Sequence, residues 1–156
     1  MTFEYTAEQR LLCDSVRKML KEIATPEYIR ATDQEGRYPY EVYDGFVKLG
    51  LIAMAFPEAY GGLGGDLMDF VAVSEEIGKV SYDYLGGYGT CVFNGINLLH
   101  NGSEEQKRTF IPKLINGEIR MSIAMTEPGA GSDAGAMRTT AKRDGDYWVL
   151  NGQKVF

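Results

Sequence analysis

The hydrophobic pattern of this chain changes its period near residue 120, and this change restricts the folds that the chain can adopt. Before that point apolar residues recur every three or four positions, which is the spacing of an amphipathic helix. After it, the turn-forming pairs Asp144-Gly145 and Asn151-Gly152 separate short runs of β-type residues. The pattern predicts an α+β fold. An all-α helical bundle is expected over residues 1–119, and the beginning of an antiparallel, β-barrel-like domain over residues 120–156.

Helices account for most of the first part. Two of them should begin at capping boxes, Thr6 to Gln9 and Ser103 to Gln106, because such pairs satisfy free backbone N–H groups at a helix start. Residues 82–101 are apolar enough for a helix, although each interior glycine costs about 1 kcal/mol relative to alanine. The other expected helices cover residues 7–25, 40–49 and 66–79. The helix after Ser103 should bury Phe110, Leu114 and Ile115, and Pro112 inside it is a candidate site for a kink.

The second part should form a small sheet. The two turn pairs fit type I′ turns and predict a meander of residues 137–143, 146–150 and 153–156, and residues 121–126 should add a further strand. The last expected strand ends at Phe156, which would leave an edge and an apolar face without partners. We therefore expect the sheet to continue in a longer protein, and we expect a fragment ending here to self-associate.

Composition excludes several classes of function. A net charge of −6 argues against a nucleic-acid partner, because phosphate binding depends on clustered Lys and Arg. The longest apolar run, residues 49–56, is too short to cross a membrane, and the first residues lack the pattern of a signal peptide. Cys13 and Cys91 fit no metal-ligand spacing, which predicts buried thiols, a reducing compartment and hence a cytoplasmic protein.

The loop at residues 124–136 carries the strongest functional signal. It holds three glycines, two hydroxyl groups and two carboxylates. Glycines allow a backbone to approach a ligand closely, and successive N–H groups form a concave anion site. Residues 129–134 also satisfy the dinucleotide pattern G-x-G-x-x-G/A, but no helix is expected to follow, so a Rossmann site is rejected. A turn in which Ser132 and Asp133 bond locally is the plain structural alternative.

The residues of this loop resemble a known signature. Met125-Thr-Glu-Pro-Gly-Ala-Gly-Ser-Asp133 resembles the signature of acyl-CoA dehydrogenases, flavoproteins that desaturate acyl-CoA thioesters between the α and β carbons. Three other segments occur in the order of that family. Residues 57–62 resemble its P-E-x-x-G-G turn, residues 104–112 its helix before the β-domain, and residues 151–156 its hairpin before a flavin-contacting strand. The resemblance covers essentially the whole chain.

The resemblance implies a set of cofactor and substrate contacts. Thr126 would hydrogen-bond the isoalloxazine ring of FAD, and Ser132 would lie near both the FAD diphosphate and the CoA ester. Phe156 would be the aromatic residue that begins the next flavin-contacting strand. The alternative is a buried aromatic residue of a strand without contact to the flavin. Tyr84 and Tyr88 would bound the acyl pocket, although an aromatic pair at this spacing is more often core. The cofactor-binding residues implied are Met125, Thr126, Gly131, Ser132 and Phe156, and the substrate-binding residues are Ser132, Tyr84 and Tyr88.

No catalytic base is expected within this chain. His100 reads as a surface residue at a helix end, and Glu127 and Asp133 can simply cap backbone donors. In the resembling family the glutamate that removes the α proton belongs to a C-terminal helical domain, and electrons pass to an electron-transferring flavoprotein. The resemblance also implies a homotetramer or other homo-oligomer and a role in fatty acid metabolism. An acyl-CoA oxidase, a flavin monooxygenase of the same fold, or a non-catalytic helical interaction module remain alternatives.

Overall fold

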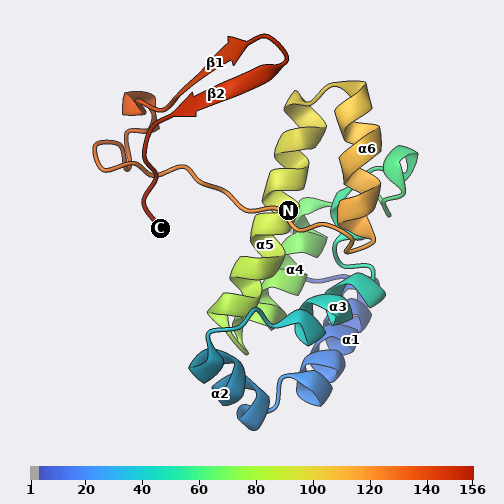
Figure 1. Cartoon of the computed structure of the whole chain (residues 1–156). Helices are drawn as coiled ribbons and strands as arrows, with labels where there is room; N and C mark the ends of the chain where they lie inside the picture. Colours follow the sequence, from blue (N-terminus) through green and yellow to red (C-terminus); the bar gives the residue numbers. More distant parts are fainter. Residues whose placement is uncertain (1–3) are drawn as a thin grey trace. The chain divides into compact units, whose positions relative to one another are not determined.

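The computed structural model describes residues 4–156, which form two compact units, one ending at Met121 and the other spanning Ser122–Phe156. Residues 1–3, part of the segment on which the absence of a signal peptide was predicted, lie outside the described residues. The first unit is helical (Figure 1). Its elements are α1 (Ala7–Ile23), α2 (Pro26–Glu35), α3 (Tyr40–Lys48), η1 (Ala53–Ala55), η2 (Glu58–Tyr60), α4 (Leu67–Gly78), α5 (Tyr82–Asn101) and α6 (Glu104–Ile115).

Side-chain caps define where the helices of this unit begin. Thr6 and Ser103 form the two predicted capping boxes, with Gln9 and Gln106 as their third residues. Asp66 forms a further capping box at the start of α4. The sequence pattern does not predict α2, because Pro26 indicates the end of the first helix. Proline is also favoured in the first turn of a helix, because a backbone N–H there has no partner within the helix and its absence costs no hydrogen bond.

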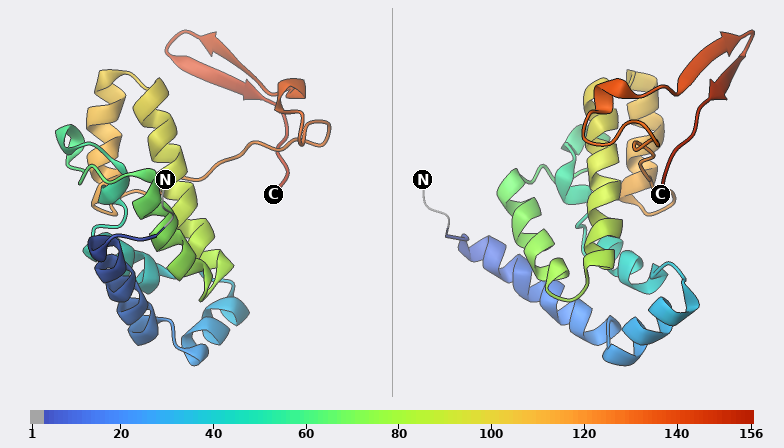
Figure 2. Two further views of the ribbon diagram at one scale, coloured as in Figure 1. Left: turned by 180° about the vertical axis from the view of Figure 1, so that it is seen from behind. Right: turned by 90° about the vertical axis from the view of Figure 1, so that its left-hand side faces the viewer.

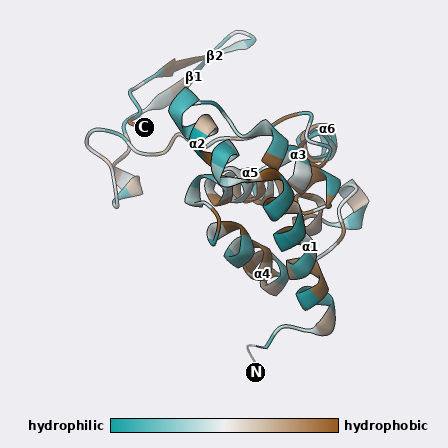
Figure 3. Cartoon of the chain, turned by 90° about the horizontal axis from the view of Figure 1, so that it is seen from below, coloured by the Kyte–Doolittle hydropathy of each residue, from teal (hydrophilic) through white to brown (hydrophobic). Residues whose placement is uncertain are grey.

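The longest helix, α5, forms the centre of the helical unit. It packs against α3, α4 and α6, while α1 packs against α3 and α4 (Figure 2). Along α1 and α4 hydrophobic and hydrophilic segments alternate, as expected for amphipathic helices (Figure 3). The core includes the fully buried aromatic residues Tyr43, Phe46, Phe56 and Tyr88. Cys13 and Cys91 are buried free thiols, as predicted.

Two details of α5 and α6 depend on packing. The helix predicted for residues 82–101 is confirmed despite its glycines, and one of them is required: a Cβ at Gly95 would collide with Phe56 and lie 2.6 Å from Leu114 Cδ2. The predicted burial of Phe110 is wrong, because its side chain is 41% exposed. Ile111 is buried in its place, since it shares a helix face with Leu114 and Ile115.

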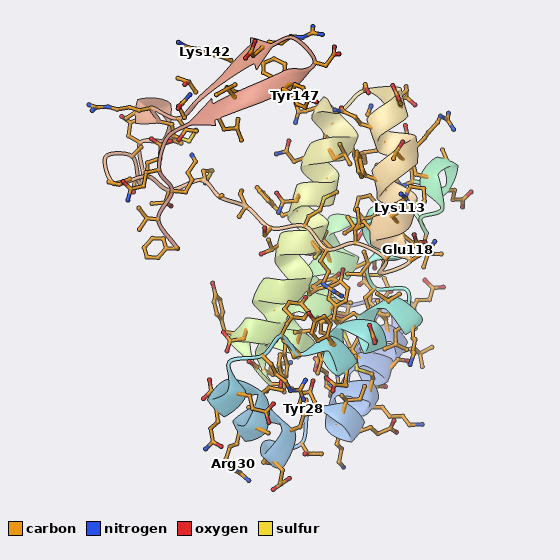
Figure 4. The ribbon with its side chains drawn as sticks, in the orientation of Figure 1. Tyr28, Arg30, Lys113, Glu118, Lys142 and Tyr147 are labelled. Atoms are coloured by element: carbon orange, nitrogen blue, oxygen red, sulfur yellow. The ribbon has the colours of Figure 1, made fainter. Side chains whose placement is uncertain are left out.

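The second unit contains a single hairpin. Its strands, β1 (Thr140–Asp144) and β2 (Tyr147–Asn151), pair antiparallel with Thr140 opposite Asn151. Both strands are exposed along their whole length, and Lys142 and Tyr147 project from them into solvent (Figure 4). A two-stranded hairpin on its own is marginally stable in water, because it has no buried face.

The predicted meander is wrong in extent and in turn type. Residues 121–126 and 153–156 form no strand, although Val155 N–H donates to Thr126 O at 2.9 Å. Because Asp144 pairs with Tyr147, the central turn residues are Gly145 and Asp146. Of these only Gly145 has positive φ, at 59°, which is the type II′ pattern rather than type I′. No helix in residues 4–156 is both long enough and apolar enough to cross a membrane.

Candidate functional site

The glycine loop of the second unit is built around a tight turn. Glu127 N–H donates to Ala130 O at 2.9 Å, and Ala130 N–H donates back to Glu127 O at 3.1 Å. Pro128 and Gly129 occupy the tip between them. The chain then continues through Ser132 to η3 (Ala134–Ala136), whose first turn is capped by the Asp133 carboxylate accepting from Gly135 N–H at 3.1 Å. The prediction that Asp133 caps a backbone donor is therefore confirmed.

The buried carboxylate of Glu127 connects this loop to later residues by hydrogen bonds. It is almost fully buried and accepts from Arg138 N–H at 2.7 Å, Thr139 N–H at 3.0 Å and Lys154 Nζ at 2.9 Å. The hydrogen bond from the Arg138 backbone, followed by those from Thr139 and Lys154, lowers the pKa of Glu127 from 4.5 to about 2. A carboxylate with three donors and this pKa is a poor proton acceptor at neutral pH. Its predicted role as a cap is confirmed.

Lys154 completes the support of the loop. Its ammonium group also donates to Met125 O at 3.1 Å, and the next residue, Val155, bonds to Thr126 O. The chain after the hairpin is thus fastened to the residues that precede the glycine turn. We call Glu127 and Lys154 the loop clamp. Sequence reasoning missed it, because the two residues are 27 positions apart and no local motif links them.

Four of the predicted cofactor-binding residues, Met125, Thr126, Gly131 and Ser132, belong to the clamped loop or directly precede it. Met125 is about half exposed and Thr126 is partly buried. Within residues 4–156, the hydroxyl groups of Thr126 and Ser132 and the N–H groups of Gly131 and Ser132 make no hydrogen bond. A Cβ at Gly131 would meet nothing within 4 Å, so a ligand can approach its backbone closely. This set of unused donors fits a ligand with phosphate or carbonyl oxygens.

Phe156 occupies a different environment from these four residues. It directly follows Val155, whose N–H binds Thr126 O, and its ring is fully exposed. The structure therefore brings the chain of Phe156 to the loop without burying its side chain. Its predicted flavin contact stays a prediction.

Tyr84 and Tyr88 lie in the core of the helical unit. Tyr84 is 4% exposed, while Tyr88 is fully buried, stacks on Phe70 at a centroid distance of 5.5 Å and donates to Leu51 O at 3.4 Å. Burial raises the pKa of both phenols. Core packing accounts for their spacing without a ligand, so the substrate-binding role of this pair stays a prediction.

Another face of α5 is open. Gly86 and Gly89 lie three residues apart on one side of the helix, and a Cβ at either would meet nothing within 4 Å. Phe93, one turn beyond Gly89, is 59% exposed, and Tyr82, one turn before Gly86, is 80% exposed. We call these four residues the glycine face. It is an exposed strip of α5 with an aromatic residue at each end. His100 is exposed in the last turn of the same helix, as predicted.

Comparison with known proteins identifies the class to which this fold and loop belong. Residues 6–118 match the model of the acyl-CoA dehydrogenase N-terminal domain, and residues 122–156 match that of the acyl-CoA dehydrogenase middle domain. The first match alone covers well over half of the chain. The chain belongs to the acyl-CoA dehydrogenase family.

Individual relatives agree with this assignment. A "Probable acyl-CoA dehydrogenase YngJ" of Bacillus subtilis is 39% identical over 100% of this chain and 41% of its own length. The "Caffeyl-CoA reductase-Etf complex subunit CarC" of Acetobacterium woodii is 38% identical over 97% of this chain and 41% of its own. The chain thus spans about two fifths of the curated relatives it matches.

Solved structures show the same fold. A glutaryl-coenzyme A dehydrogenase in complex with glutaryl-CoA superimposes with a TM-score of 0.88 at 34% identity, covering 99% of this chain and 40% of that one. An acyl-CoA dehydrogenase of Bacillus anthracis complexed with FAD superimposes with a TM-score of 0.79 at 28% identity, covering 97% of this chain and 27% of that one.

Proposed function

We propose that this chain supplies part of the active site of a flavin-dependent acyl-CoA dehydrogenase, which desaturates an acyl-CoA thioester between its α and β carbons. The observation that carries the proposal is the glycine loop held by Glu127 and Lys154, in which the Thr126 and Ser132 hydroxyl groups make no hydrogen bond within residues 4–156. The N–H groups of Gly131 and Ser132 are likewise unused there. The family membership and the relative complexed with FAD support FAD as the cofactor. When bound, FAD would supply the two-electron acceptor for the reaction.

The residues of the loop would bind and polarise the cofactor. We assign Thr126, with Met125 beside it, to the isoalloxazine ring, and Gly131 and Ser132 to the diphosphate. A fixed hydroxyl donor at the ring stabilises negative charge that develops on it, and a donor held in place beforehand does so without reorganisation. The loop clamp supplies this rigidity, because it ties the backbone on both sides of Thr126 to residues 138, 139 and 154.

The substrate would be an acyl-CoA thioester whose acyl chain lies along the glycine face. Open space above Gly86 and Gly89 supports this placement, since a chain can lie against the helix backbone there. Glu127 is unsuited to remove the α proton, because three donors hold its pKa near 2. We therefore assign the base to a part of the protein outside this chain. The relative from an Etf complex supports an electron-transferring flavoprotein as the redox partner.

Reduction of the flavin in the full-length protein tests the proposal. Anaerobic mixing with a panel of acyl-CoA esters should bleach the flavin absorbance, and oxygen should reoxidise the reduced enzyme slowly. Absence of bleaching by every ester would refute dehydrogenation. Fast reoxidation by oxygen would instead favour an acyl-CoA oxidase.

A matched pair of variants tests the assigned role of Thr126. Thr126→Val should lower kcat about 100-fold, the typical effect of removing one preorganised donor, and should also weaken FAD binding. Thr140→Val, in the exposed strand β1, should change neither quantity. Equal behaviour of the two variants would contradict the assignment.

A further inference from the structure

The ammonium group of Lys154 is held by as many acceptors as it has N–H bonds. These acceptors are Met125 O at 3.1 Å, Glu127 Oε1 at 2.9 Å and Met137 Sδ at 3.6 Å. The Lys154 side chain is only 27% exposed, and partly buried charges are screened much less than exposed ones. The ammonium group is therefore a positive charge fixed beside the backbone of the glycine loop.

The hydrogen bond to Met125 O acts on a peptide group whose other end is free. Met125 C=O and Thr126 N–H belong to the same peptide group, and within residues 4–156 the Thr126 N–H makes no hydrogen bond. A donor on a peptide oxygen draws electrons away from the nitrogen, so the N–H of that group becomes a stronger donor. A charged donor does this more strongly than a neutral one. Lys154 thus strengthens a donor that has no partner in the described part of the chain.

The next peptide group offers no equivalent donor. Its oxygen, Thr126 O, accepts from Val155 N–H at 2.9 Å, but its N–H, that of Glu127, already donates to Ala130 O at 2.9 Å. Of the two polarised peptide groups around Thr126, only the one that Lys154 contacts therefore has an N–H available to a ligand.

The carboxylate of Glu127 reduces the effect of Lys154 without cancelling it. It also accepts from the N–H groups of Arg138 and Thr139, so its negative charge is shared among three donors. Part of the positive charge of Lys154 therefore remains available to Met125 O. The two halves of the loop clamp act on the Thr126 N–H in opposite directions, whereas both halves hold the loop rigid.

We propose that Lys154 is a positioning residue that raises the reduction potential of the FAD bound at this loop, acting through the Met125–Thr126 peptide group. The inference rests on the proposed function, which assigns Thr126 to the isoalloxazine ring. A stronger donor at the ring stabilises the additional negative charge of the reduced cofactor, and hydrogen bonds to the ring tune its electronics. Rigidity alone would hold the oxidised and the reduced cofactor equally well.

The midpoint potential of the bound FAD in the full-length protein tests the proposal, together with the dissociation constant of oxidised FAD. Lys154→Met should make binding of the reduced cofactor about tenfold weaker relative to the oxidised one, the usual difference between hydrogen bonds with charged and with neutral groups. For a two-electron couple this tenfold change lowers the potential by about 30 mV. Lys154→Arg keeps the charge and should retain most of the wild-type potential.

Two further variants separate charge from rigidity. Glu127→Gln removes the opposing charge and should raise the potential, which is the opposite sign to Lys154→Met. Lys142→Met removes a lysine from the exposed strand β1 and should leave the potential unchanged (Figure 4). A shift of equal size in Lys142→Met would overturn the inference, because the overall charge of the unit would then explain the effect.

The remaining outcomes distinguish this inference from the proposed function. If Lys154→Met weakens the binding of both forms of FAD equally, the potential stays constant and the inference fails, while dehydrogenation stands. Shifts of Lys154→Met and Glu127→Gln in the same direction would also overturn it, because a loosened loop would explain both. If Lys154→Met does not fold, the sign of the Glu127→Gln shift decides. Opposite shifts in a protein whose flavin no acyl-CoA ester reduces would support the inference and refute dehydrogenation. A full-length protein that binds no FAD would refute both.

Discussion

Alanine at Gly89 and at Gly95 should change the stability of the protein in opposite directions. Both glycines lie inside α5, where replacement of glycine by alanine favours the helix by about 1 kcal/mol. At Gly89 the new Cβ meets nothing within 4 Å, so Gly89→Ala should raise the free energy of unfolding by about that amount. At Gly95 the new Cβ would overlap the ring of Phe56 and approach Leu114 Cδ2 to 2.6 Å.

The size of the effect at Gly95 follows from its neighbours. Phe56 and Leu114 are both fully buried, so neither can move without disturbing the core. Overpacking of this kind costs about 1–3 kcal/mol, and two rigid neighbours favour the upper half of that range. Because both variants gain the same helix propensity, the difference between their unfolding free energies gives the packing cost directly. We expect a difference of about 2–3 kcal/mol.

Urea unfolding followed by far-ultraviolet circular dichroism measures both variants under the same conditions. The midpoint should rise for Gly89→Ala and fall for Gly95→Ala, with equal slopes if the surface exposed on unfolding is unchanged. For a chain of this size, 1 kcal/mol corresponds to about 2–4 °C in Tm, so a thermal scan gives an independent measure. Equal shifts of both variants in the same direction would refute the reasoning, because helix propensity alone would then explain the glycines.

Three further predictions concern the caps, clamps and contacts of the two units. Glu127 has a lowered pKa, so its contribution to stability should be complete above about pH 4.5 and be lost as the pH falls toward 2. The NMR chemical shift of the Arg138 amide should report this titration, and Glu127→Gln should abolish it. A titration midpoint near 4.5 would contradict the buried clamp. Arg120 lies over the rings of Tyr38, Tyr40 and Tyr43 at 4.7–5.5 Å, so Arg120→Met should lower the free energy of unfolding by about 1–2 kcal/mol in urea, and Arg120→Lys by less. Thr6→Ala should cost about 1 kcal/mol by the same assay, and no loss would mean that α1 begins without help from its capping box.

Local signals explain the success of the helix predictions. The capping boxes at Thr6 and Ser103 and the start of α5 at Tyr82 depend on residues within a few positions of each other, so their physics is present in the sequence. The error at α2 had a local cause as well. Pro26 can end one helix or begin the next, and only the cap formed by Thr25 decides between the two.

The strand predictions failed where pairing depends on distant partners. Residues 121–126 and 153–156 have the composition of strands, but in the described chain they meet through a single backbone bond and the Lys154 side chain. Strand propensity reflects packing against neighbouring strands more than an intrinsic backbone preference. A pattern of residues therefore does not show whether a partner strand lies close enough to pair.

The sequence alone determined the change from helices to a hairpin near residue 120, the glycine loop, and the resemblance of that loop to acyl-CoA dehydrogenases. Only the tertiary structure decided the surroundings of individual side chains. It placed Tyr84 and Tyr88 in the core, turned Glu127 into one half of the loop clamp, and left open space above Gly86 and Gly89. The physical reason is that burial, pKa and open space depend on contacts between residues far apart in the chain, which a linear pattern does not encode.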